Sequence, residues 1–395
     1  MNNSRVLRLE PNSTSPNFIA GYSGNSVTAG VFGATIGGGG TSSVGINRVT
    51  DHYGTVSGGR GNRAGDGDGD PADATYATVG GGYLNYASGS QSTIGGGREN
   101  STTATYATVG GGYSNEASGA SATVGGGVNN TASGETATVC GGDNNTASGW
   151  SATVAGGENN TAAGDNSFAA GYRARANSTG CFVWGDSTYA DVSCNVANRW
   201  VARASGGVYF YTNPGLTSGV YVASGGNSWN AVSNRALKEN FEPVDTQALL
   251  ERLVRIEITT WNYKSQDPAI RHIGPMAEDF NALVNGLGGE GQDYINSLDA
   301  DGVALAAIQG LYSLVQEKDA RIAELEERVA ALEAWNVAQQ AQIDDLEARL
   351  TALEQRAGDA PASASIAPSL SGLVMGGLAI VGAVALWREW ERGKR

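Results

Sequence analysis

The chain has 395 residues, of which 59 are glycine, and a net charge of −14 at pH 7. This length exceeds one compact core, so two or three structural units are expected. The glycines follow no Gly-X-Y register and the chain has only nine prolines, which excludes collagen. The excess of acidic residues argues against a nucleic-acid partner, because no basic patch is present to neutralise phosphates.

A 15-residue repeat dominates residues 1–166. Six copies of the phrase A/S-T-V/I, followed by small residues, run without a gap, and their central apolar residues are Val79, Ile94, Val109, Val124, Val139 and Val154. Because so short a unit cannot bury its apolar side alone, each copy must stack on its neighbours. We predict a parallel β-roll head in which each repeat forms one coil, a surface or spacer without an enzyme pocket.

The coils before the regular repeat are irregular. Their apolar anchors are separated by 17, 20 and 23 residues, at Ile19, Ile36, Val56 and Val79. The longest insertion holds alternating Asp and Gly at 66–70, which resembles a calcium loop because hard oxygens can converge on one ion. The complete 12-residue loop would have Glu where Ala77 stands, so a solvated acidic loop is favoured. We predict no metal and no cofactor.

Residues 167–232 are predicted to form a β-rich neck, since aromatic density rises and short strands such as 207–212 are bounded by turn residues. Of the three cysteines, Cys140 takes a glycine position of the repeat and is expected to be a small buried residue. A bridge between Cys181 and Cys194 is left open.

Residues 233–307 have a mixed pattern, with a helix expected near 246–254, a strand near 255–263 and a second helix near 276–284. The segment contains four motifs: SNRALKEN at 233–240, ITTWNY at 258–263, RHIGPMAE at 271–278 and SLDADG at 297–302. These motifs closely resemble the endosialidase-type intramolecular chaperone, a module that closes phage tail spikes and fibres and also occurs in a membrane-bound transcription factor of animals. The 15-residue repeats resemble the head repeats of trimeric autotransporter adhesins, which form a left-handed β-roll in a three-chain head.

The chaperone resemblance implies self-cleavage by a Ser–Lys dyad, with Ser233 as nucleophile and Lys238 as base. A serine hydroxyl needs a neighbour to take its proton, and a lysine does so when its own pKa is lowered. Attack on the carbonyl of Val232 passes through a five-membered ring, which favours cleavage between Val232 and Ser233. Cleavage after Ser233 would need a different attacker, for example from another chain. Asn234 stands where the family more often has Asp.

Ser233, Lys238 and His272 also have purely structural interpretations. Ser233 can be a helix N-cap, with Lys238 a solvated side chain. His272 lies in the family's most recognisable motif, where either an assisting role in cleavage or a structural hydrogen bond is open. No metal-like cluster accompanies His272 in the sequence.

Residues 308–356 change to an unbroken 3-4 spacing of apolar residues: Ile322, Leu325, Val329, Leu332, Ile343, Leu346, Leu350 and Leu353. This pattern predicts a left-handed coiled coil about 70 Å long. Asn336 and Gln339 fill the a and d positions of one layer, and such a polar layer fixes register at a cost in stability. The chain is therefore expected to be an obligate oligomer, although the heptads alone do not choose between dimer and trimer.

The C-terminal region begins with a linker at 357–369. Residues 370–387 then carry no charge and would span roughly 27 Å as a helix, which predicts a transmembrane segment. Basic residues in the tail at 388–395 place the C-terminus in the cytoplasm and the remainder outside. The N-terminus has no apolar stretch of the kind found in a secretory signal, so none is expected.

The predicted fold class is mainly β plus α: β-roll head, β-rich neck, small α+β chaperone unit, coiled-coil stalk and transmembrane helix. The predicted function is a membrane-anchored homotrimeric surface protein whose adhesin-like head binds an unknown ligand. The chaperone unit would assemble it and cleave once at Ser233. Two alternatives stay open: a precursor whose head is released by autoproteolysis, and a viral spike or tail fibre.

Overall fold

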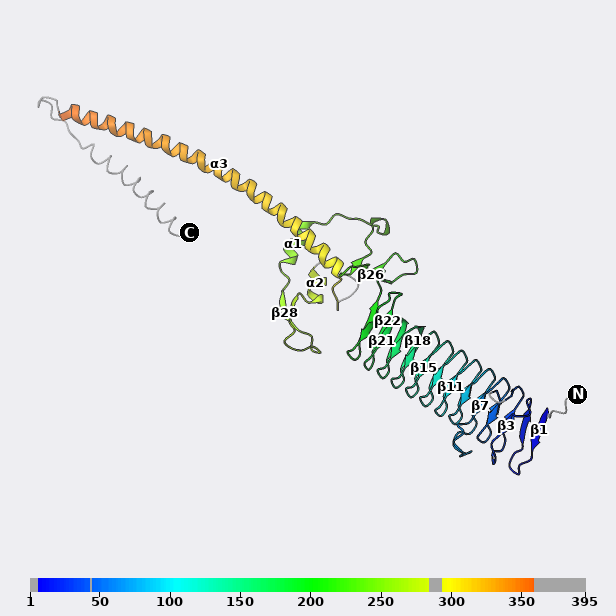
Figure 1. Ribbon diagram of the computed structural model, residues 1–395. Helices are drawn as coiled ribbons and strands as arrows, with labels where there is room; N and C mark the ends of the chain where they lie inside the picture. Colours follow the sequence, from blue (N-terminus) through cyan, green and yellow to red (C-terminus); the bar gives the residue numbers. More distant parts are fainter. Residues whose placement is uncertain (1–5, 43–44, 284–292, 359–395) are drawn as a thin grey trace. The chain divides into compact units, whose positions relative to one another are not determined.

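The computed structural model describes residues 6–42, 45–283 and 293–358. These residues form two compact units divided between Glu239 and Asn240. The N-terminal unit contains a β-solenoid and a small antiparallel sheet, and the C-terminal unit contains helices and a β-hairpin (Figure 1). The predicted β-roll head is confirmed.

Two long sheets form walls of the solenoid (Figure 1). The first sheet contains, in spatial order, β1 (Leu7–Glu10), β2 (Asn17–Ala20), β4 (Thr35–Ile36), β6 (Thr55–Val56), β8 (Thr78–Val79), β10 (Thr93–Ile94), β12 (Thr108–Val109), β14 (Thr123–Val124), β16 (Thr138–Val139), β18 (Thr153–Glu158), β20 (Phe168–Tyr172), β22 (Phe182–Gly185) and β24 (Trp200–Arg203). The second contains β3 (Ser26–Val27), β5 (Arg48–Val49), β7 (Arg63–Ala64), β9 (Tyr86–Ala87), β11 (Ser101–Thr102), β13 (Glu116–Ala117), β15 (Thr131–Ala132), β17 (Thr146–Ala147), β19 (Thr161–Ala162), β21 (Ala174–Ala176) and β23 (Val192–Cys194). All pairings are parallel except that of β1 with β2.

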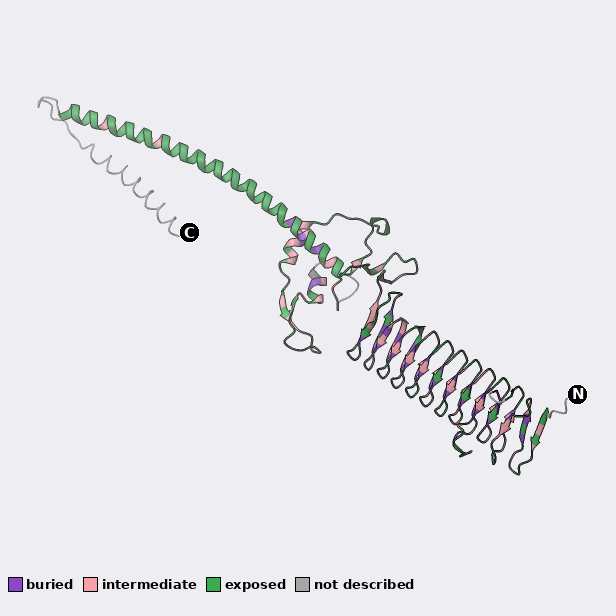
Figure 2. Ribbon diagram, in the orientation of Figure 1, coloured by how far each residue is buried: buried purple, intermediate pink, exposed green. Residues whose placement is uncertain are grey.

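The repeat sets the register of the stacked coils. Ile94 pairs with Val79 on one side and with Val109 on the other, so equivalent residues lie directly above one another. The Val and Ile residues of the first sheet are fully buried from Ile36 to Val183, and alanines of the second sheet such as Ala117 belong to the same buried cluster (Figure 2). Each regular coil, such as the one with Ala122, Val124 and Ala132, therefore contributes one larger and two smaller apolar side chains to a continuous narrow core.

A ladder of buried asparagines runs through the solenoid. The side-chain oxygen of Asn115 accepts a hydrogen bond from the backbone N–H of Asn130, 3.0 Å away in the next coil. Its amide nitrogen donates to the carbonyl oxygens of Gly111 and Gly127 at 2.9 and 2.8 Å. The same pattern repeats at Asn25, Asn47, Asn62, Asn85, Asn100, Asn130, Asn145 and Asn160. The ladder satisfies backbone groups that the two-residue strands leave unpaired.

Close stacking explains the glycines of the repeat. Gly112 has a φ of +91°, and a Cβ atom at this position would lie 2.2 Å from the carbonyl oxygen of Gly127. Glycine alone tolerates both the left-handed backbone and this approach.

The parallel sheets continue beyond residue 166, where the repeat-based boundary of the head was placed. Ala169 pairs with Val183 and Val183 with Val201, so the last coils are 14 and 18 residues long and lack the repeat phrase. A disulfide joins Cys181 to Cys194 within this part. Cys140 is a free and exposed cysteine, so its predicted burial is wrong. It follows the buried Val139 and therefore points to the opposite side of the strand.

Asp186 joins the ends of the last coils. Its carboxylate accepts hydrogen bonds from the backbone N–H of Ser205 at 2.7 Å and from the backbone N–H of Thr188 at 3.1 Å, and it pairs with Arg203 at 2.7 Å. The hydrogen bond from Ser205, followed by the interaction with Arg203, holds the pKa of Asp186 far below its usual value. The carboxylate therefore stabilises this end of the solenoid in its charged form.

We expect Asp186→Asn to lower the melting temperature at neutral pH. The folded-state pKa is lowered, so the stabilisation is complete above the unfolded-state pKa of about 4 and declines as the pH falls below it. The difference between wild type and variant should thus be constant from pH 6 to 8 and shrink in acid, which circular dichroism can follow. The exposed Glu135→Gln serves as control. A difference that stays constant into acid would contradict this role of Asp186.

Beyond the solenoid, β25 (Gly207–Tyr211), β26 (Gly219–Ala223) and β27 (Asn230–Ala231) form an antiparallel sheet. It is followed by a 3₁₀ turn, η1 (Arg235–Leu237). Several aromatic side chains of this region are exposed, among them Tyr209, Phe210, Tyr211 and Trp229.

The C-terminal unit has a small core built from Leu249, Ile256, Phe280 and Val303. Its elements are α1 (Thr246–Leu253), β28 (Thr259–Trp261), β29 (His272–Gly274), α2 (Ala277–Leu283) and α3 (Ser297–Gly358). Helix α1 packs on α3 at Gly310, where a Cβ atom would lie 2.3 Å from the carbonyl oxygen of Thr246. The two helices and the strand expected in this region are confirmed as α1, α2 and β28.

Helix α3 has 62 residues, of which only Val303, Ala307 and Gly310 are buried (Figure 2). Among the described residues it is the one helix long and apolar enough to cross a membrane, with a mean hydropathy of 1.2 over 18 residues. Those residues include the part that packs on α1, and a core helix meets the same requirement. The transmembrane helix predicted at 370–387, most of the linker before it and the basic tail lie outside the described residues.

Candidate functional site

Ser233 lies two residues after the end of β27, the last strand of the antiparallel sheet. The residue before Ser233 is still hydrogen-bonded to the sheet: the backbone N–H of Val232 donates to the carbonyl oxygen of Gly219 at 3.1 Å. Every strand of the N-terminal unit therefore lies on the N-terminal side of the Val232–Ser233 peptide bond.

A short turn places Lys238 opposite Ser233. The side chain of Asn234 caps η1 by accepting a hydrogen bond from the backbone N–H of Ala236 at 2.9 Å. Lys238 ends the same turn, with its backbone N–H donating to the carbonyl oxygen of Arg235. The capping position is thus held by Asn234, and the alternative in which Ser233 is the N-cap is wrong.

The two residues predicted as a dyad are in contact. Lys238 Nζ donates a hydrogen bond to Ser233 Oγ over 2.6 Å. Both side chains are exposed in the single chain, as is Asn234, whereas Val232 is half-buried. Nucleophile and base must lie within hydrogen-bond reach for proton transfer, and this pair meets that requirement.

Residues 233–289 match the model of the family described as chaperone of endosialidase. The chain carries an endosialidase-type chaperone segment. No curated protein matches the chain. The chaperone segment together with the β-solenoid fits a tail-fibre-like protein.

His272 lies in β29 of the chaperone segment. Its Nε2 atom lies 2.9 Å from Gln266 Oε1, and its ring stacks on Trp261 with the centroids 4.7 Å apart. Tyr263 meets the same ring edge-on. These contacts place His272 in an aromatic cluster on the hairpin.

The residues of the predicted polar coiled-coil layer lie on α3 beyond the chaperone segment. Asn336 is exposed and Gln339 is half-buried. The apolar residues at the neighbouring a and d positions are exposed as well, with Leu325 at 43%, Val329 at 53% and Leu332 at 62%. In the single chain this helical face has no covering element among the described residues.

A second cluster lies in the solenoid, where Asp51, Asp66 and Asp73 bring their carboxylates together. Asp66 belongs to the acidic run recognised in the sequence, whereas Asp51 and Asp73 were not predicted to join it. A signal was present, because Asp51 and Asp66 are 15 residues apart, which is one period of the repeat and places them on adjacent coils.

Proposed function

We propose that this chain is a homotrimeric, tail-fibre-like surface protein whose chaperone segment assembles the β-solenoid head and then cleaves the chain before Ser233. The observation that carries the cleavage is the 2.6 Å hydrogen bond between Lys238 Nζ and Ser233 Oγ in the matched segment. The head has an attachment role toward an unidentified surface ligand. Residues 370–387 form the membrane anchor, and the C-terminal tail lies in the cytoplasm.

The cleavage proceeds through an ester. The neutral amine of Lys238 accepts the proton of the Ser233 hydroxyl while Oγ attacks the carbonyl carbon of Val232. The C–N bond then breaks, its nitrogen takes up the proton and becomes the free amino group of Ser233, and the acyl group of Val232 remains on Oγ. Water hydrolyses this ester, which leaves a carboxylate on Val232 and restores the serine hydroxyl.

Assembly supplies the environment that the dyad needs. Ser233 and Lys238 are exposed in the single chain, and a lysine acts as a base when it is shielded from water. Exposed aromatic residues nearby, such as Trp229 and Phe210, provide the apolar surface that other protomers would cover. Cleavage would then follow trimer formation.

The physical task of the chaperone follows from the fold. Side-by-side solenoids form few local contacts between chains, so the three chains must be held in register before the heads assemble. A small globular unit followed by the exposed heptad face of α3 raises the local concentration of the chains.

The test is expression of the full chain followed by mass spectrometry and N-terminal sequencing. We expect two fragments, one of about 24 kDa in proportion to 40.4 kDa for 395 residues and one that begins at Ser233. An intact chain as the sole product, or a new N-terminus elsewhere, would contradict the proposed cleavage without affecting the trimer.

The position of the cut supports release of the head as a second function. All strands of the solenoid and of the antiparallel sheet precede the cut, whereas the proposed anchor follows it. Separation of membrane and soluble fractions distinguishes release of the head from its retention. A soluble 1–232 fragment indicates release, and a 1–232 fragment that stays with the membrane fraction indicates a retained head. Detection of the chain in purified virus particles would instead support a viral fibre.

The trimer is tested by charge substitutions on α3. We expect Leu325→Asp with Leu332→Asp to dissociate the protein to single chains, because both replacements place a carboxylate at heptad core positions. Ala331→Asp, on the exposed face of the same helix, should leave the trimer intact. Analytical ultracentrifugation in detergent gives the mass, with Ser233→Ala as background to keep the chain whole. A well-folded single chain without these substitutions would contradict the proposal.

A further inference from the structure

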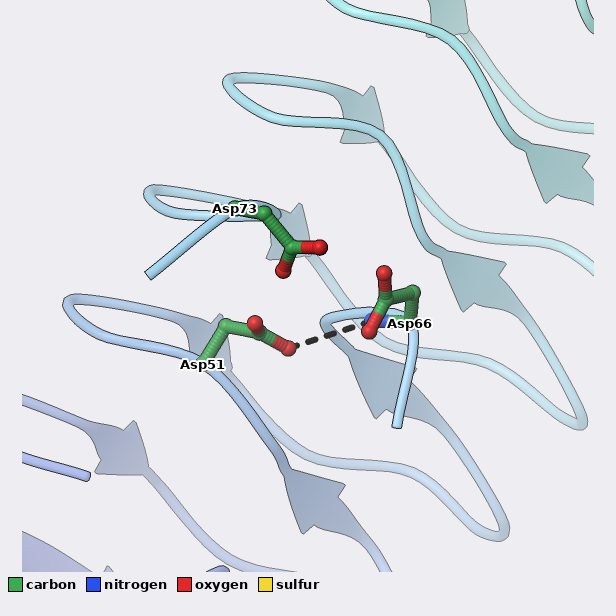
Figure 3. Close-up of side chains that lie close together, drawn as sticks. All are labelled: Asp51, Asp66 and Asp73. Atoms are coloured by element: carbon green, nitrogen blue, oxygen red, sulfur yellow. Dashed lines mark hydrogen bonds between the residues drawn. The ribbon is translucent and has the colours of Figure 1, made fainter. Parts of the chain in front are cut away.

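Three carboxylates meet on the coils that carry the longest insertion. Asp51, Asp66 and Asp73 each place one oxygen within 4.8 Å of the others (Figure 3). Asp51 follows strand β5, Asp66 follows β7 in the next coil, and Asp73 lies in the insertion that leads to β8. The cluster therefore connects two neighbouring coils and the loop between them.

Asp51 provides the observation that points to a ligand. Its side chain is 0% exposed. Oδ2 accepts hydrogen bonds from Thr50 Oγ1 at 2.7 Å and from the backbone N–H of Asp66 at 3.1 Å. Oδ1 is buried without a hydrogen-bond partner, and Figure 3 shows the carboxylate turned toward Asp73 and Asp66. A buried carboxylate oxygen without a donor is costly, so a missing positive partner is expected at this point.

The described part of the chain supplies no cationic side chain to the cluster, because none of its ion pairs involves the three carboxylates. Arg63, on β7, donates to Ser88 Oγ and lies over the ring of Tyr86 instead. Burial, together with the negative charge of Asp66, raises the pKa of Asp51, while the hydrogen bond from Thr50 opposes the rise. The backbone N–H of Ala74 also interacts with the carboxylate and lowers that pKa.

We propose that Asp51, Asp66 and Asp73 bind a divalent cation and that Ca²⁺ is the favoured ion. The donors are all hard carboxylate oxygens, which Ca²⁺ and Mg²⁺ prefer over the softer ligands of transition metals. His52, the nearest histidine in the chain, is engaged elsewhere, since its Nδ1 accepts from the backbone N–H of Phe32 and its ring stacks on Phe32. Asp73 is exposed, so water completes the larger and irregular coordination shell that Ca²⁺ tolerates.

The rest of the acidic run does not belong to the site. Asp68 and Asp70 are exposed, and Asp68 Oδ1 accepts a hydrogen bond from the backbone N–H of Asp70 in a local turn. Gly65 is required next to the site, because a Cβ atom there would lie 1.9 Å from Asp51 Oδ2. The ion would fasten the insertion to the solenoid wall, which protects the loop at 67–72 from proteolysis.

Calorimetry on the detergent-solubilised full chain, stripped with a chelator and titrated with CaCl₂ or MgCl₂, tests the site. We expect one Ca²⁺ per chain with a Kd of about 10⁻⁴–10⁻³ M and weaker binding of Mg²⁺. Asp51→Asn and Asp73→Asn should each weaken Ca²⁺ binding at least about tenfold, whereas the matched Asp68→Asn should stay within about twofold. Ca²⁺ should also slow protease cleavage of the 67–72 loop in the wild type and in Asp68→Asn.

Three results would overturn the site. One is an absence of Ca²⁺ binding in the wild type at about 10 mM Ca²⁺. Another is wild-type affinity in both Asp51→Asn and Asp73→Asn. The third is an equal loss in Asp68→Asn, which would indicate diffuse attraction by an acidic loop. If Asp51→Asn fails to fold, Asp73→Asn decides the question, because Asp73 is exposed.

Discussion

Ser233→Ala is expected to abolish cleavage completely, leaving an intact chain of 40.4 kDa where the wild type yields two fragments. The substitution removes the only atom that attacks the Val232 carbonyl in the proposed step and retains the backbone of the turn, since η1 is capped by Asn234. Lys238→Arg should have nearly the same effect, because a guanidinium keeps the charge but does not act as a base. Time-resolved gels and intact-mass measurement quantify both.

Two controls make the result specific. Ser228→Ala replaces an exposed serine five residues upstream and should leave cleavage unchanged. Ser233→Cys retains a nucleophile and should retain a fraction of the activity. Cleavage in the Ser233→Ala chain at the wild-type rate would show that a different group, or a contaminating protease, makes the cut. Loss of cleavage in Ser228→Ala would point to damaged folding.

Asn115→Ala is expected to destabilise the solenoid by about 2–4 kcal/mol. The substitution deletes three hydrogen bonds, to the carbonyl oxygens of Gly111 and Gly127 and from the backbone N–H of Asn130. Asn115 and Asn130 are buried, so water does not replace the partner that the Asn130 N–H loses. Urea unfolding followed by circular dichroism measures the loss, and hydrogen exchange should show the largest increase in the coils on either side.

The matched comparison is Glu116→Gln, which changes the adjacent exposed residue and should lie within about 0.5 kcal/mol of wild type. Asn115→Asp is a second, sharper variant: it retains the acceptor for the Asn130 N–H but loses both donated hydrogen bonds and buries a charge. Stability of Asn115→Ala equal to that of Glu116→Gln would contradict the structural role of the ladder.

The β-roll head could be predicted because the 15-residue period determines both where each strand lies and which residues of the next coil it pairs with. Ile94 must pair with Val109 once each repeat forms one coil, and it does. The period did not predict how far the parallel sheets extend, because the coils after Val154 change in length and lose the phrase, while hydrogen bonding between strands continues to Arg203. Backbone pairing between coils does not require the repeated sequence phrase. The period therefore shows where the sequence repeat ends, but it does not show where the stack of coils ends.

Spacing alone did not establish the contact between Ser233 and Lys238. The same five-residue interval allowed a helix cap, and only the backbone shows that Asn234 fills that role and leaves the Ser233 hydroxyl to Lys238. The direction of Cys140 could have been predicted, because it follows a buried strand residue and side chains alternate. The unpaired Oδ1 of Asp51 could not, because pairing depends on the position of every nearby donor.

Because equivalent residues of neighbouring coils stack in register, the length of the head can change in steps of one whole coil. Gain of one whole 15-residue unit would lengthen the fibre by about 4.8 Å and reproduce every inter-coil contact of its neighbours. Extra residues in a loop, as between Asn62 and Asn85, leave the buried asparagines aligned, whereas a deletion that removes part of the strands would move them away from their acceptors. Unequal recombination between such units would thus give a family of filaments of different lengths, each with an intact interior.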